Sequence, residues 1–282
     1  MTFRTTRIGF IIAGSVIGLL HYFCGISLYW LIAPSVIAVE LLVYGSGTIQ
    51  SNFHARAYCS GNSTEKEIAL TFDDGPNSTY TPKVLSLLAE YQAPATFFVI
   101  GKHIPGNESI LKQIDADGHS IGNHTYTHSF FIDFKSTRAF KDELSRTSDA
   151  VCKIIGKRMR LFRPPYGVTT PHLAKASKGL GYRIIGWNIR SLDTTGDSAD
   201  IITRRVLTQI KPGAVILFHD TSDKTVEVLK RTLAFAQAND YKIVTIERLL
   251  GIKAYELTHA AETGEAKNRL LTLLSFAKSK GY

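Results

Sequence analysis

Polar residues that could hold a metal follow two apolar runs of the sequence. Asp73 and Asp74 close one run in the motif TFDDGP, and His124 and His128 begin and end the motif HTYTH after another. An Asp-Gly-Pro sequence is also ordinary turn chemistry, and an HxxxH pair alone is weak evidence. A spacing of four would put both imidazoles on one side of a helical turn. One carboxylate and two imidazoles, with positions left open for water, are typical of catalytic zinc and suit other divalent metals.

The doubled aspartate predicts different roles for the two carboxylates. Successive residues of a strand point different ways, so one carboxylate can bind the metal while its neighbour acts as a base. The metal lowers the pKa of its water and polarises a carbonyl, and the base takes the proton as the water attacks. His219 in the motif ILFHD is then available as the acid that protonates a departing amine. The plainer interpretation of His219 is a strand-end histidine bonded to the backbone.

The elements that must position these residues alternate between short apolar runs and helical patterns. The runs are continuous rather than alternating, which is typical of strands buried on both faces of a parallel sheet. We expect strands at 68–72, 95–100, 119–122, 160–163, 182–187, 214–218 and 241–246, and helices at 80–91, 137–155, after Thr170, 199–210 and 224–238. This alternation predicts an α/β fold, a (β/α) barrel or a near relative, over residues 60–251. The polar groups would share its C-terminal face, where catalytic residues gather.

The first 59 residues (1–59) are predicted to form a membrane anchor. Residues 8–24 and 26–45 are each close to the roughly 20 apolar residues that cross a bilayer. Glu40 is the only charged residue between Ile8 and Ala55. A cleaved signal peptide is the alternative, but the apolar run is too long for one. Basic residues before the first span and after the second favour a hairpin with both ends in the cytoplasm, whereas a single span would leave the domain facing outward.

Composition limits the remaining classes of function. The chain has 282 residues and a formal net charge of +9, but the excess is diffuse and includes no basic run with interleaved aromatics, so no nucleic-acid partner is expected. Anionic lipid or an acidic polymer fits the charge equally well. Cys24, Cys59 and Cys152 are scattered, which indicates neither a thiolate metal site nor a disulfide framework, and no obligate protein partner is evident. Residues 252–282 are predicted to be a C-terminal helical tail.

Four motifs in order, TFDDGP, HTYTH, RPPYG and ILFHD, resemble those of the NodB-like polysaccharide deacetylases, carbohydrate esterase family four. The resemblance covers residues 68 to about 250. It implies a distorted (β/α) barrel of the NodB-like type with a metal-dependent N-deacetylase site, here preceded by a transmembrane helical hairpin. It also implies Asp73 as general base, Arg163 as the residue that orients Asp73, and His219 as general acid.

The same resemblance implies the metal and substrate contacts. The metal ligands would be Asp74, His124 and His128, holding a divalent ion that is zinc by preference and cobalt or manganese as alternatives. The N–H of Tyr166 would help to hold the oxyanion. Residues that shape the substrate groove or line a pocket for the acetyl methyl group would be Pro164, Pro165, Tyr166 and Leu217.

One motif departs from the family pattern. The family often has Asp-x-x-Asp-Trp after the fifth strand, but here Arg190 stands where the first aspartate would be and Thr194 where the tryptophan would be. That aspartate normally tunes the acid histidine. Two hypotheses stay open, namely that Asp193 tunes His219 instead, or that Arg190 binds an anionic part of the substrate. The departure bears on the substrate more than on the reaction, because the metal and base residues are intact.

The expected function is removal of N-acetyl groups from the amino sugars of a cell-envelope glycan, such as peptidoglycan or an N-acetylglucosamine polymer. If the domain faces the cytoplasm, deacetylation or deformylation of a lipid-linked amino sugar is more natural. A non-catalytic glycan-binding barrel is an alternative of another class, which the presence of Asp73 and His219 disfavours. An amidase or O-esterase on the same barrel is a third. The expected location is a bacterial-type cytoplasmic membrane, with the glycan and membrane lipid as partners.

Overall fold

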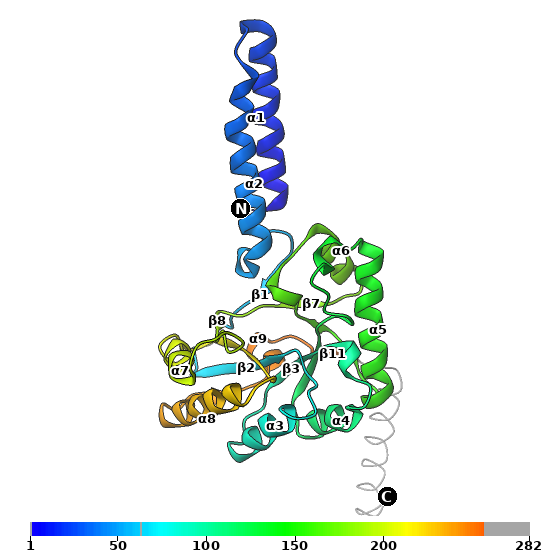
Figure 1. Cartoon of the computed structure of the whole chain (residues 1–282), viewed down its shortest axis with the longest axis vertical. Coiled ribbons are helices and arrows are strands. Elements are labelled where there is room, and N and C mark those ends of the chain that lie inside the picture. Colours follow the sequence, from blue (N-terminus) through cyan, green and yellow to red (C-terminus); the bar gives the residue numbers. More distant parts are fainter. Residues whose placement is uncertain (1, 63, 257–282) are drawn as a thin grey trace, which may run out of the picture.

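The computed structural model describes residues 2–62 and 64–256, which form a projecting helical hairpin and an α/β domain (Figure 1). The domain contains a nine-stranded parallel sheet in the order β1-β7-β6-β4-β3-β2-β9-β8, with β10 paired to β2. The order does not return to its first strand, so the sheet is an incomplete barrel. The predicted distorted (β/α) barrel is therefore confirmed.

Strands form within all the predicted apolar runs, with short additions, but in the run 241–246 only Lys242–Ile243 is strand and Ile246 already begins a helix. They are β1 (Ala57–Tyr58), β2 (Glu67–Asp73), β3 (Thr96–Val99), β4 (Ser120–Asn123), β6 (Leu161–Phe162), β7 (Arg183–Ile185), β8 (Ile189–Arg190), β9 (Val215–His219) and β10 (Lys242–Ile243). A separate antiparallel pair joins β5 (Arg158–Met159) to β11 (Tyr255–Glu256). Strands buried on both faces explain the continuous apolar runs. The ring of Phe72 on β2, for example, stacks between Phe97 at 5.1 Å and Phe218 at 5.8 Å.

Helices flank the sheet in the alternation that the sequence predicts (Figure 1). They are α3 (Thr81–Glu90), α4 (Glu108–Ala116), α5 (Thr137–Ile155), α6 (Pro171–Gly179), α7 (Ala199–Leu207), α8 (Asp223–Ala238) and α9 (Ile246–Leu250). Thr170 caps α6 by accepting the N–H of Leu173, as its Thr-Pro start suggests. Helix α4 is missing from the predicted elements, although its buried Ile110, Leu111 and Ile114 have helical spacing.

The N-terminal hairpin consists of α1 (Phe3–Cys24), the 3-10 turn η1 (Leu28–Leu31) and α2 (Ile32–Gly47). Segments Phe3–Cys24 and Leu28–Gly47 are long and apolar enough to cross a membrane, by length and composition. At 1.5 Å per residue, 22 helical residues extend about 33 Å, close to the thickness of a bilayer core. The two helices lie side by side and project away from the domain, whose elements cover neither of them (Figure 1).

The packed domain is longer at both ends than the predicted range 60–251. Ile49 and Ala57 belong to the buried core, and β1 pairs with β7, so packing of the domain includes part of the predicted anchor range 1–59. Ala254 is also in the core, and the hydroxyl of Tyr255 accepts the N–H of Ile121 at 2.7 Å, so packing of the domain includes residues beyond 251. Residues 257–282 of the predicted helical tail lie outside the described residues.

Candidate functional site

The register of the sheet brings the predicted site residues to one edge. β2 and β9 pair so that Asp73 lies opposite His219. β4 pairs with β3 and with β6, so His124 and Arg163, which directly follow β4 and β6, emerge at the same edge. Because these strands are parallel, this edge is the C-terminal face, where catalytic groups gather in barrels of this kind.

Asp74, His124 and His128 converge just beyond the strand ends. Oδ1 of Asp74 lies 3.6 Å from Nε2 of His124 and 3.5 Å from Nε2 of His128. The three ligand atoms all lie within 4.8 Å of one another, the sole such group in residues 2–62 and 64–256. Oδ1 of Asp74 is buried without a hydrogen-bond partner, an arrangement that a bound cation would satisfy. Two imidazole nitrogens and a carboxylate fit a divalent transition metal.

The surroundings of His124 favour metal binding further. Its Nδ1 lies 2.7 Å from the main-chain oxygen of Arg163, an arrangement that directs Nε2 toward Asp74. Burial lowers the pKa of His124 to about 3, although the Asp74 carboxylate opposes the shift. The imidazole is therefore neutral near pH 7, the form that coordinates metals.

The loop that carries both histidines is not a helical turn, so that part of the sequence interpretation is wrong. Residues 124–128 are irregular, and His128 has a positive φ of 47°. Oε2 of the buried Glu143 on α5 accepts the N–H groups of Tyr126 at 2.9 Å and Thr127 at 2.7 Å. The imidazoles converge because this carboxylate holds the loop, a contact between segments that local spacing does not reveal.

Asp73 and Arg163 form a buried ion pair beside the metal cluster. Nη1 of Arg163 donates to Oδ1 of Asp73 at 2.8 Å, and Oδ2 of Asp73 lies 3.8 Å from Nε2 of His124. Arg163 is fully buried and also donates to Thr71 and to the main-chain oxygen of Gly186. Burial raises the pKa of Asp73, and the charges of Arg163 and the nearby imidazoles oppose that rise. One carboxylate oxygen is thus fixed by Arg163, and the other faces the cluster.

Asp193 holds His219 through both its imidazole and its main-chain N–H. Nδ1 of His219 lies 2.7 Å from Oδ1 of Asp193, while Oδ2 of Asp193 accepts the main-chain N–H of His219 and the hydroxyl of Thr225, both at 2.8 Å. The hydroxyl of Ser191 also donates to Oδ1, at 2.9 Å. Burial lowers the pKa of His219, but the hydrogen bond and the charge of Asp193 outweigh it and raise this pKa to about 9. The imidazole can therefore hold a proton at neutral pH.

The predicted groove residues differ in exposure. Tyr166 is 45% exposed with a φ of 58°, and its ring centroid lies 4.9 Å from that of His128. Pro164 and Pro165 are buried in the bend before it. A Cβ at Gly167, where φ is 73°, would lie 2.5 Å from the ring of Trp187, so the bend requires glycine.

Leu217 and Arg190 lie side by side on paired strands but have different surroundings. Leu217 is 2% exposed, within β9. Arg190 is exposed, with its guanidinium 5.7 Å from the ring centroid of Trp187, and no ion pair joins it to a residue of the described chain.

Some neighbours of the site are absent from the sequence-based predictions. Thr225, in the first turn of α8, contacts Asp193 across 32 positions of sequence, and nothing local predicts this contact. Phe130, Phe131 and Phe134 are 75%, 67% and 87% exposed, and the ring centroid of Phe130 lies 6.2 Å from that of Tyr166. The run SFFIDF directly after HTYTH was an available signal for this aromatic rim.

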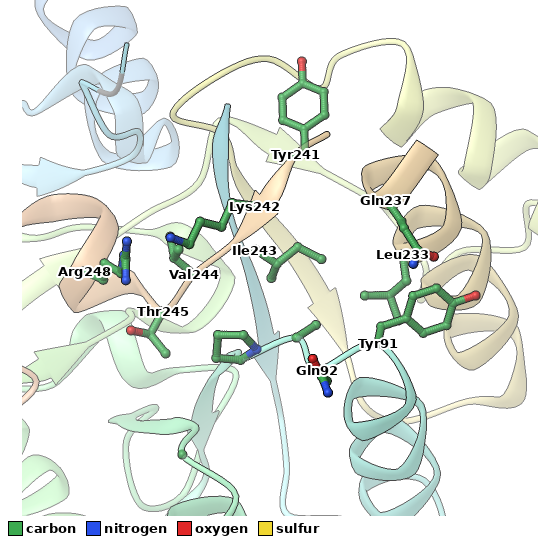
Figure 2. Close-up of a pocket in the computed structure, with 13 residues that line it drawn as sticks. Tyr91, Gln92, Leu233, Gln237, Tyr241, Lys242, Ile243, Val244, Thr245 and Arg248 are labelled. Carbon is green, nitrogen blue, oxygen red and sulfur yellow. The ribbon is translucent and has the colours of Figure 1, made fainter. Parts of the chain in front are cut away.

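The cavity in Figure 2 is not this site. It encloses about 560 Å³ and is lined by residues that precede β3 and β4, such as Pro94 and Gly118, and by Lys242 to Thr245. These positions lie at the amino ends of the strands, opposite the candidate site. None of the predicted site residues lines it.

The family model and the curated relatives that match this chain are described as deacetylases. A family model described as polysaccharide deacetylase matches residues 60–185. The peptidoglycan-N-acetylglucosamine deacetylase PgdA of Listeria monocytogenes is 36% identical over 190 residues, covering 67% of this chain and 40% of that protein. A peptidoglycan-N-acetylglucosamine deacetylase of Bacillus cereus is 36% identical over 197 residues, covering 67% of this chain and 90% of that one. The chain thus spans 40% of the length of the Listeria relative.

Solved structures match over the same domain. The peptidoglycan N-acetylglucosamine deacetylase Bc1960 has a TM-score of 0.67 and 31% identity, covering 71% of this chain and 95% of that chain. BA3943 of Bacillus anthracis, described as a CE4 family pseudoenzyme, has a TM-score of 0.64 and 26% identity, covering 69% of this chain and 68% of that chain. Because a named deacetylase and a named pseudoenzyme share this fold, the fold alone does not decide activity.

Proposed function

Because the chain belongs to the polysaccharide deacetylase family, we propose that it hydrolyses the N-acetyl groups of amino sugars in a glycan. The observation that carries this proposal is the pairing of two oriented groups around one cluster. A buried carboxylate, Asp73, is held by Arg163 on one side, and an imidazole, His219, is held by Asp193 on the other. Amide hydrolysis needs a base and an acid in such positions.

In this proposal the two groups move the protons. Oδ2 of Asp73 takes a proton from the attacking water as the new carbon–oxygen bond forms at the acetyl carbonyl. His219 donates its proton to the sugar nitrogen as the carbon–nitrogen bond breaks, releasing acetate and a free amine. The N–H of Tyr166 stabilises the developing oxyanion. Arg163 and Asp193 position the base and the acid without touching the substrate.

The family uses a divalent metal, and Asp74, His124 and His128 would hold it here. Such an ion polarises the acetyl carbonyl and makes water more acidic. Zinc is the preferred occupant, because two neutral imidazoles and one carboxylate with open positions are typical of catalytic zinc. Cobalt and manganese accept the same donors.

The substrate is proposed to lie along the rim beside Tyr166. The relatives named above act, by their names, on peptidoglycan N-acetylglucosamine. The exposed rings of Tyr166 and Phe130 offer flat apolar surfaces for pyranose rings. Pro164 and Pro165 shape the bend, and Leu217 lines the pocket for the acetyl methyl group. Arg190, which is exposed and has no acidic partner in the described chain, is proposed to bind an anionic part of the glycan, which would account for its departure from the family pattern.

We also propose that the hairpin anchors the domain to a membrane with both ends on the cytoplasmic side. Arg4, Arg7 and Arg56 lie at the end of the hairpin next to the domain, and residues 25–31 at its far end carry no charge. Excess positive charge marks the cytoplasmic side. This orientation favours a lipid-linked amino sugar, acetylated or formylated, over the mature wall glycan.

One experiment tests the proposed reaction. The full chain is incubated with N-acetylglucosamine oligomers and peptidoglycan, with and without chelator, and released acetate is measured. We expect metal-dependent acetate release that Asp73→Asn abolishes. Glycan binding without acetate release would instead support a non-catalytic barrel, and release from O-acetylated but not N-acetylated glycan would support an esterase.

A second measurement addresses the membrane side. A reporter that is active on only one side of the membrane is fused to the C-terminus, and its activity is measured in cells. We expect the activity of a reporter that lies in the cytoplasm. Activity of a reporter that lies outside the cytoplasmic membrane would contradict the proposed hairpin orientation. The mature wall glycan would then be the preferred substrate.

A further inference from the structure

A basic groove lies beside the base of the hairpin, away from the candidate active site. It encloses about 640 Å³ between the segment His54–Tyr58, α6 and the start of β7. Four cationic side chains line it, Arg56, Lys175, Lys178 and Arg183, and none of its lining residues is acidic. All four are exposed. We call this surface the hairpin-base groove.

The cations of the hairpin-base groove have no acidic partner within the described chain. Some exposed cations elsewhere on the domain do have one, as Arg158 does with Asp149 and Arg231 with Asp200. Arg56 contacts only an aromatic face, with its guanidinium 4.9 Å from the ring centroid of Tyr58. The sequence explains the imbalance, because no Asp or Glu occurs between Asp149 and Asp193, a stretch with nine Lys and Arg residues.

The position of the groove relative to the hairpin is fixed by hydrogen bonds. Nε2 of His54, a lining residue, lies 2.9 Å from the hydroxyl of Ser46 in the last turn of α2. The main-chain oxygen of Phe53 accepts the N–H of Phe3 at the start of α1, at 2.9 Å. The hairpin-base groove therefore begins where the two apolar helices end, and β1, β7 and α6 are the elements nearest to this end (Figure 1).

We propose that the hairpin-base groove binds the phosphate headgroups of anionic phospholipids in the leaflet at which the hairpin ends. This inference rests on the proposal that the hairpin spans a membrane. Because the proposed span ends at the groove, the lipid headgroups would lie at the same height as the four cations of the groove. Each cation near an anionic leaflet contributes to the attraction between the protein and the lipid surface. Cations without an acidic partner bind a phosphate group without first breaking an ion pair within the protein. Occupancy would fix the tilt of the domain over the lipid surface.

The test uses the purified full chain in a neutral detergent. Soluble dihexanoyl phosphatidylglycerol is titrated while the midpoint of thermal unfolding is followed, and an apparent Kd is obtained from the linkage. Dihexanoyl phosphatidylcholine and inorganic phosphate are titrated in parallel. The variant is Lys175→Gln with Lys178→Gln, and the matched control is Lys211→Gln with Lys230→Gln, two exposed lysines that do not line the groove.

We expect stabilisation by phosphatidylglycerol only, with a Kd about 30-fold weaker in the groove variant, since two lysines near a charged lipid surface contribute about 1 kcal/mol each. The control variant should match the wild type. Equal effects of the two lipids, equal effects of the two variants, or inorganic phosphate acting as well as phosphatidylglycerol would each overturn the proposal. Acetate release from soluble oligomers is measured on the same samples, so failure of lipid binding is distinguished from failure of the proposed reaction.

Discussion

Replacement of Asp193 by asparagine should move the alkaline limit of activity to lower pH. His219 must carry its proton to act as an acid, so the rate falls as pH rises through the pKa of His219. In the wild type the hydrogen bond and charge of Asp193 raise that pKa to about 9 against the effect of burial. Without that charge, the pKa should fall toward its ordinary value of about 6.5, because burial lowers it while the smaller effects of the Asp73 and Asp74 charges raise it.

The size of the effect follows from these two values. At pH 8, a group with a pKa of about 9 is about 90% protonated, whereas one with a pKa of about 6.5 is about 3% protonated. Activity of Asp193→Asn at pH 8 should therefore fall by about 30-fold from protonation alone. At pH 6 both forms are mostly protonated, so this part of the loss should nearly vanish.

The assay is initial acetate release from a soluble N-acetylglucosamine oligomer between pH 5.5 and 10, with metal in excess. Asp193 also accepts bonds from Ser191, Thr225 and the main-chain N–H of His219, so an amide there leaves some donors without an acceptor, and thermal unfolding must be measured alongside. Asp200→Asn, on an exposed aspartate of α7, is the matched control. A folded Asp193→Asn protein with an unshifted alkaline limit would refute the role of Asp193.

Three further predictions concern neighbouring residues. Arg163→Met leaves the buried carboxylate of Asp73 without its cation, so the free energy of unfolding in urea should drop by about 3–5 kcal/mol, and a drop below about 1 kcal/mol would contradict the buried pair. His128→Ala removes one of the candidate ligands, so zinc retained per chain after gel filtration should fall below about half of the wild-type value, with unchanged retention arguing against this metal site. Gly167→Ala would bring a Cβ within 2.5 Å of Trp187 at a positive φ, so the free energy of unfolding should fall by about 1–3 kcal/mol, and thermal unfolding at the wild-type midpoint would count against the strain.

The sequence predicted the sheet well because its strands are buried on both faces. Continuous apolar runs leave little choice of element, and each run ended where a polar group begins, so the C-terminal face could be predicted from the chain order alone. The resemblance then assigned roles to further residues, such as Arg163 and Tyr166. Helix α4 was missed although its apolar residues have helical spacing.

Contacts between distant segments could not be predicted in the same way. The convergence of His124 and His128 depends on Glu143 of α5, and the environment of Asp193 depends on Thr225 of α8. In both cases one polar side chain satisfies main-chain or side-chain donors of another element, and no local pattern encodes such a pairing. The helical-turn interpretation of residues 124–128 failed for this reason.

The path from the hairpin to the candidate site is short, which bears on the proposed membrane-bound substrate. Ser46, in the last turn of α2, accepts the N–H of Thr169 at 3.0 Å, and Tyr166 at the rim of the site is three positions earlier. Three residues extend at most about 11 Å, so the rim lies near the end of the hairpin. A glycan that is itself tethered to lipid would be presented at that height, whereas a glycan far from the membrane would not. If the hairpin spans the membrane as proposed, the bond between Ser46 and Thr169 therefore favours a membrane-bound substrate.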